Sequence, residues 1–118
     1  MLAQIAPEAD TEDEDDAFAM TNLRPRRTGL PMTVYVSLQS GSKHDVRVKV
    51  STVHGQTLDP SRTAVVSVRP EPKLIHGELT GRDLELVKRW IELNRDLLIA
   101  HWEARLDSED MFEQVRSL

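Results

Sequence analysis

The four histidines are the residues of this chain best suited to chemistry near neutral pH, because imidazole changes charge there and also binds metal ions. They lie far apart, at His44, His54, His76 and His101. No two of them have the short spacing that is typical of paired metal ligands. The sequence therefore predicts no metal site and no cofactor. It leaves open a small nuclease-like enzyme in which His44, His54 or His101 serves as acid and base.

Other catalytic patterns are missing from the sequence. A serine nucleophile needs an activating turn and a base, and the serines of the predicted strands and turns have no such motif around them. The glycines are isolated, so no loop has the composition that cradles a phosphate. We therefore expect no catalytic residue, no bound small molecule and a protein that is not an enzyme.

Two polar residues fall among apolar ones in the C-terminal half. Asn94 and His101 are seven residues apart and share the apolar side of a predicted helix. Burying them without hydrogen bonds would be costly, so each needs a partner. We expect them to bond backbone groups of the sheet or of the returning C-terminal segment. The alternative is a polar pocket between helix and sheet.

Basic residues are concentrated in the central part of the chain. Positions 23–73 hold nine bases against three acids, whereas the residues before Asn22 hold seven acids and no base, and positions 74–118 hold six bases and ten acids. The candidate interaction residues of the central part are Arg47, Lys49, Arg62, Arg69 and Lys73. Such a basic sheet face could follow a phosphate backbone, with the acidic N-terminal segment as a competitor for it.

The length and composition indicate one domain behind an acidic tail. Residues 1–22 combine low hydrophobicity with like charge, which predicts disorder, and residues 23–118 are long enough for a single core. The chain has no cysteine and no apolar run that could cross a membrane, so we expect a cytoplasmic protein. Two prolines between Leu23 and Pro31 favour extended backbone there, with Leu23 and Leu30 against the domain.

Strand and helix periodicities follow one another along the domain. Alternation and β-branched residues predict strands at 32–38, 43–50, 63–69 and, in short form, 73–76. A helix is predicted from Gly81 to about Leu106 with Thr80 as N-cap, and a short helix from Ser108 to Leu118. The fold class is therefore α+β: a small antiparallel sheet of three or four strands packed against a long C-terminal amphipathic helix.

The apolar side of the long helix is wide. It includes Trp90 and Trp102 near its two ends, and it is broad enough to meet both the sheet and another surface. We therefore add the two tryptophans to the candidate interaction residues.

The stretch from Trp90 to Trp102, WIELNRDLLIAHW, resembles an uncharacterised family of short prokaryotic proteins. In that family a few strands precede a helix that has tryptophans near both ends and a leucine pair between them. Its members are often encoded in small gene pairs that look like toxin-antitoxin modules. The resemblance extends over residues 79–118 and more loosely over the strands, and the chain departs from it at Asn94, where we expect a histidine. It implies this fold and a prokaryotic or phage origin, and it assigns no activity.

These observations favour a non-enzymatic, accessory or regulatory protein that binds another protein or a second copy of itself. The binding surface would be an exposed strand edge or surplus apolar helix surface. The alternative is a nucleic-acid-binding regulator that uses the basic sheet face.

Overall fold

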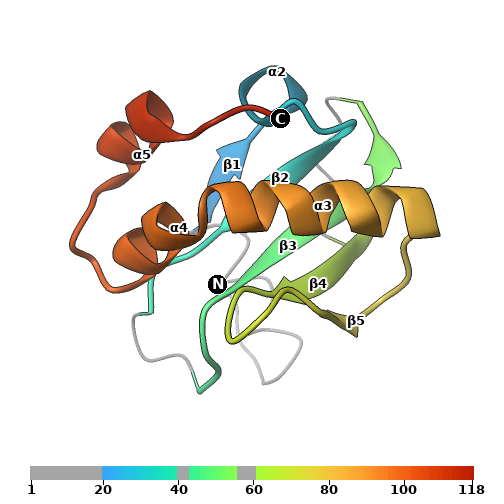
Figure 1. Cartoon of the computed structure of the whole chain (residues 1–118), viewed down its shortest axis with the longest axis horizontal. Helices are drawn as coiled ribbons and strands as arrows, with labels where there is room; N and C mark the ends of the chain where they lie inside the picture. Colours follow the sequence, from blue (N-terminus) through green and yellow to red (C-terminus); the bar gives the residue numbers. More distant parts are fainter. Residues whose placement is uncertain (1–19, 40–42, 56–60) are drawn as a thin grey trace, which may run out of the picture.

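Runs of valine and threonine form the centre of the molecule, because β-branched side chains pack well on a pleated surface. The computed structural model describes residues 20–39, 43–55 and 61–118. Five antiparallel strands make one sheet in the order β1-β2-β3-β4-β5 (Figure 1). They are β1 (Thr21–Leu23), β2 (Met32–Val36), β3 (Arg47–His54), β4 (Thr63–Ser67) and β5 (Leu74–His76).

The antiparallel sheet that the sequence predicts is confirmed, with one strand more than expected. Strand β1 pairs with β2 from Thr21 onward, so the sheet begins inside the segment predicted as tail. The second predicted strand is shifted: β3 runs on to His54, because Ser51 pairs with Thr63 and His54 with Met32. The rest of the predicted tail, residues 1–19, and most of the turn at 39–42 lie outside the described residues.

The segment between Leu23 and Pro31 differs from its prediction. Residues Pro25–Thr28 form a single helical turn, α2, because proline at the first helical position loses no hydrogen bond. The expected packing of this segment is confirmed, since Leu23 and Leu30 are both buried.

The predicted long helix is two helices. α3 spans Gly81–Leu93 and α4 spans Arg95–Trp102, and the backbone of Asn94 between them leaves helical geometry. Thr80 is the N-cap of α3, as predicted: its hydroxyl accepts a hydrogen bond from the Asp83 amide. A third helix, α5 (Ser108–Gln114), ends earlier than expected, and the chain continues in extended form from Val115.

The core lies between one face of the sheet and helices α3 and α4, which run across that face (Figure 1). Val48, Val50 and Val66 come from the sheet, and Val87, Trp90 and Ile91 come from α3; all six are buried. Strand β2 is buried along its whole length, so its second face is covered as well, contrary to a sheet covered on one face only. Within the described part of the chain, no helix is long and apolar enough to cross a membrane.

Candidate interaction surface

Two of the predicted basic residues share a sheet face. Val46, Val48 and Val50 point into the core, so alternation places Arg47 and Lys49 on the opposite face of β3. The register sets Lys49 opposite both Tyr35 and Val65. Because Tyr35 and Val65 are buried, this face is not the open, solvated stripe that the sequence suggests.

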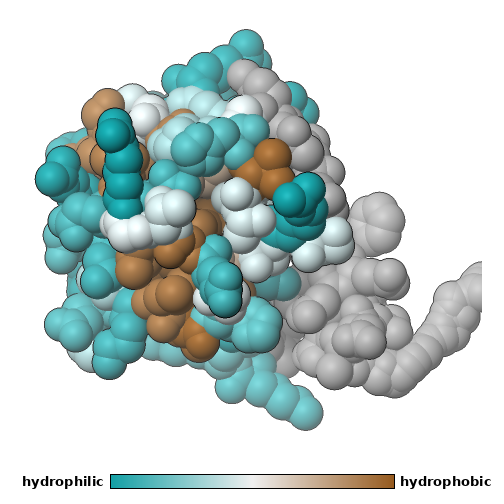
Figure 2. Space-filling model, turned by 90° about the vertical axis from the view of Figure 1, so that its right-hand side faces the viewer, coloured by the Kyte–Doolittle hydropathy of each residue, from teal (hydrophilic) through white to brown (hydrophobic). Residues whose placement is uncertain are grey.

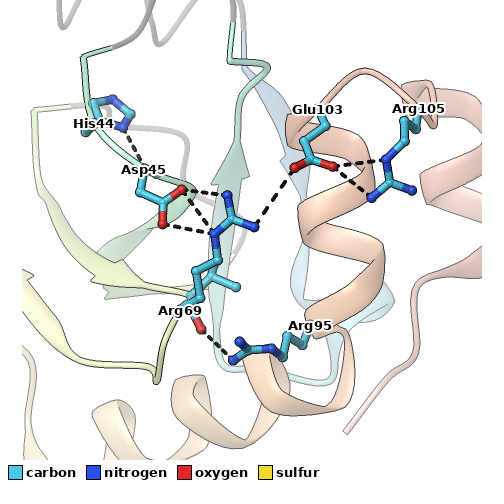
Figure 3. Close-up of polar contacts among 7 residues, drawn as sticks. His44, Asp45, Arg69, Arg95, Glu103 and Arg105 are labelled. Atoms are coloured by element: carbon cyan, nitrogen blue, oxygen red, sulfur yellow. Dashed lines mark hydrogen bonds and ion pairs between the residues drawn. The ribbon is translucent and has the colours of Figure 1, made fainter.

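Arg69 is occupied by acidic partners. Its Nε lies 2.9 Å from Asp45 Oδ2 and its Nη2 lies 2.9 Å from Asp45 Oδ1, a bidentate pair, and Glu103 approaches within 4.0 Å (Figure 3). The hydrogen bonds that Arg69 donates to the Asp45 carboxylate lower the pKa of Asp45 and raise the pKa of Arg69. Nearby, Arg95 donates to the carbonyls of Val68 and Pro70. These contacts join the end of β4 to α4, so Arg69 is not available to a phosphate.

The remaining basic candidates are exposed but separate. Arg62 precedes β4, where its carbonyl accepts a hydrogen bond from the Thr52 amide. Lys73 precedes β5 at the other end of β4, where its carbonyl accepts one from Ser67. The structure therefore brings Arg47 and Lys49 together and leaves Arg62 and Lys73 apart from each other along β4.

The two tryptophans are core residues. Trp90 is 0% exposed and Trp102 is 3% exposed, so neither indole forms part of the surface. Burial gives their assignment as interaction residues no support, because α3 and α4 turn both tryptophans onto the core. The large apolar residue of the described helices that is exposed is Leu93, with 40% of its surface accessible, beside the break at Asn94.

Asn94 binds the returning C-terminal segment, as expected from its position. Its Nδ2 donates to the carbonyls of Arg116 and Trp90, each at 3.0 Å, and its Oδ1 accepts from the Arg116 amide at 2.8 Å. The side-chain amide thus pairs with the backbone of Arg116 much as a neighbouring strand would. An open groove of about 550 Å³ runs beside this contact, between the helix break and the C-terminal segment rather than between helix and sheet.

His101 is buried against α5. Its Nε2 lies 3.3 Å from Ser108 Oγ, and its Nδ1 has no hydrogen-bond partner among the described residues. Ser108 Oγ is in turn 2.7 Å from the hydroxyl of Thr21 in β1. Burial lowers the pKa of His101, although Asp107 acts in the opposite direction. The neutral imidazole is therefore a packing residue that joins α4, α5 and the β1 edge.

The other histidines do not assemble into one site. The His44 ring packs on Trp102, with the centroids 5.4 Å apart. His54 Nε2 is 2.8 Å from Asp83 Oδ2, which ties the end of β3 to the first turn of α3. A carboxylate that orients an exposed imidazole can support general base catalysis, and a cavity of about 300 Å³ lies beside Asp83. Among the described residues no three metal-ligating side chains come together.

Strand β5 is the open edge of the sheet. Among the described strands it pairs with β4 alone, and Ile75 in its centre is 52% exposed, the most exposed large apolar residue of the described chain. Leu74 and Leu79 beside it are only partly buried. Figure 2, which looks onto the end of the molecule where α3 begins, shows apolar side chains gathered between hydrophilic ones. We call residues 73–79 the β5 edge.

Charged residues stand at both ends of the β5 edge. Lys73 precedes the strand and Glu78 follows it, both are exposed, and neither forms an ion pair with a described residue. Sequence reasoning picked out Lys73 only as part of a basic stripe and missed Ile75 and Glu78. The two adjacent apolar residues of the stretch 73–76 fit a short strand, but nothing in this stretch indicates an edge.

Comparison with known proteins finds a family match for part of this chain. No curated protein and no solved structure matches it. Residues 56–103, which include β4, β5, α3 and α4, match the family described as Domain of unknown function (DUF4160). The stretch that holds the β5 edge and the helices packed behind it is therefore similar to a domain family whose description assigns it no function.

Proposed function

We propose that this protein is a non-enzymatic interaction module that binds another protein chain at the β5 edge. The observation that carries the proposal is the exposed Ile75 in the middle of an unpaired edge strand. Unpaired backbone N–H and C=O groups at a sheet edge can pair with an extended segment of a partner.

The opposite edge of the sheet is less open. Thr21 and Asn22 of β1 are only half-exposed and Leu23 is buried. Ser108 at the start of α5 hydrogen-bonds Thr21, so a helix lies against this edge. An incoming strand would therefore find fewer obstacles at β5 than at β1.

The resemblance to proteins encoded in small gene pairs suggests where the partner comes from. In a toxin-antitoxin-like pair of prokaryotic genes, the neighbouring gene would encode one such partner; a second copy of this chain is the other. The partner would contribute an extended segment with an apolar side chain to meet Ile75.

The test compares two lysine substitutions at exposed apolar residues. Tagged wild-type protein, Ile75→Lys and Leu93→Lys are used to capture proteins from lysate of the source cell, after nuclease treatment. We expect Ile75→Lys to lose the protein that the wild type retains, and Leu93→Lys, which lies on the helix side, to keep it. Equal retention by the two variants would contradict the β5 edge as the binding surface.

A nucleic-acid-binding regulator remains the second candidate, supported by Arg47 and Lys49 on one face of β3. It predicts that the captured material includes nucleic acid without nuclease treatment, and that log affinity falls linearly with log salt concentration. The pairing of Arg69 with Asp45 and Glu103 reduces the number of phosphates this face could contact. Retention of nucleic acid alone would favour this candidate over the protein-binding one.

A further inference from the structure

We propose that the partner at the β5 edge is a second copy of this chain, which adds its own β5 in antiparallel orientation to form a continuous ten-stranded sheet. This inference rests on the proposed function and identifies the chain that binds the β5 edge. Two-fold interfaces are the commonest in soluble oligomers, and they require a surface that is complementary to itself.

The β5 edge meets that requirement through its charges. A two-fold axis through Ile75 sets Ile75 against Ile75 of the second copy and Leu74 against His76. It also sets Lys73 opposite Gly77, next to the following Glu78. The ammonium group at one end of each strand thus meets a carboxylate from the other copy, and symmetry makes this contact twice.

Gly77 ends the strand before Glu78. Its φ is 82°, a conformation that favours glycine, and a Cβ there would lie 2.8 Å from the Cα of Ala64 in β4 of the same chain. Because the backbone leaves strand geometry at Gly77, the alternation of faces does not hold Glu78 on the side away from Lys73, and no side chain stands opposite the lysine.

Apolar burial would accompany the strand pairing. The two copies of Ile75, with 52% of each exposed in the single chain, would cover one another on the face of the sheet opposite the core. A pair of three-residue strands gives a small interface, so the dimer belongs to the weak and reversible class. Its formation must therefore be followed over a wide range of protein concentration.

A charge exchange tests the arrangement. Sedimentation velocity is measured on the full chain as wild type, Lys73→Glu, Glu78→Lys and the double variant Lys73→Glu/Glu78→Lys. We expect a concentration-dependent dimer for the wild type, about tenfold weaker association for each single variant, and recovery in the double variant. All these positions are exposed, and far-ultraviolet circular dichroism checks that every variant is folded.

Several outcomes would overturn the second copy as occupant: a wild type that stays monomeric at every concentration, single variants that associate like the wild type, or a double variant as weak as the single ones. Ile75→Lys adds an independent measurement, because it places two ammonium groups on the axis and should abolish the dimer. If the wild type is monomeric and Ile75→Lys still loses the protein captured from lysate, the dimer is wrong and the proposed function stands. If charge exchange restores a dimer but no other protein is captured, the edge serves self-association.

Discussion

Single polar side chains hold the C-terminal part of this protein against the sheet and helices. Asn94 satisfies its amide on the backbone of Arg116 and Trp90, whereas His101 uses Nε2 for Ser108 and leaves Nδ1 without a described partner. A buried imidazole with one unpaired nitrogen is tolerated best in its neutral form. Protonation of the buried His101 is therefore unfavourable in the folded protein, and this affects how the free energy of unfolding depends on pH.

We expect stability to fall as the pH drops below the ordinary histidine pKa of about 6.5. Burial lowers the pKa of His101 in the folded protein, so the unfolded chain takes up the proton first and is favoured as the pH falls. His101→Leu removes this linkage. Urea unfolding at several pH values between 7 and 5 should therefore give a shallower decline for His101→Leu than for the wild type.

His76→Ala is the matched control, because His76 is exposed on β5. It should leave the wild-type decline in place. The same decline in His101→Leu as in the wild type would show that another group is responsible for it.

At the scale of elements, two side-chain contacts hold the start of α3. The Thr80 hydroxyl caps the Asp83 amide, and the Asp83 carboxylate holds His54 at the end of β3. The end of the loop that leads into α3 is thereby joined to the helix and, through Asp83, to β3. The cap contributes to stability because it satisfies a backbone donor that the helix cannot.

Thr80→Ala should lower the free energy of unfolding by about 1 kcal/mol, since the Asp83 amide then loses its acceptor. Thr80→Ser keeps the hydroxyl and should retain most of the stability. Urea unfolding monitored by circular dichroism measures both variants. Equal losses for alanine and serine would mean that the methyl group rather than the hydroxyl of Thr80 matters.

Across the whole molecule, the end of the described chain connects parts that are far apart in sequence. Arg116 is held by Asn94 at the helix break, and the Leu118 amide donates to the Thr28 carbonyl of α2 at 2.8 Å. Figure 1 shows this segment running from α5 to α2. Gly29 permits the approach, because a Cβ there would lie 2.6 Å from the Ser117 hydroxyl. Few apolar groups support this segment, so its hydrogen bonds decide its stability.

A double-mutant cycle can measure that coupling. Asn94→Ala and removal of residues 116–118 should each lower the free energy of unfolding by about 1–3 kcal/mol, because each breaks the same buried hydrogen bonds. Combined, they should cost about 1 kcal/mol less than the sum of the two. Ser117→Ala, whose hydroxyl bonds to Leu118 alone among the residues that the structure describes, serves as the control and should be close to neutral. Strict additivity would mean that Asn94 does not hold this segment.

Local pattern was sufficient for several features of this fold. The alternation of Val46, Val48 and Val50 with charged residues assigns the two faces of β3, and Thr80 marks the start of α3 from its type and position alone. Asn94 was predicted to bond backbone groups of the sheet or of the returning segment because a buried amide must find partners, and it bonds the returning segment. These features depend on near neighbours in the chain, whose geometry is set by helix and strand periods.

Only the tertiary structure decided which residues are exposed. Trp90 and Ile75 are both large apolar residues in the sequence. Trp90 is in the core because α3 covers the sheet, whereas Ile75 is on the surface because β5 is the last strand of the sheet. Arg69 was separated from the other bases by Asp45, which is 24 residues away in the chain and forms a bidentate pair with it in the fold. Strand order and cross-strand pairing join distant residues, and periodicity within one segment carries no information about them.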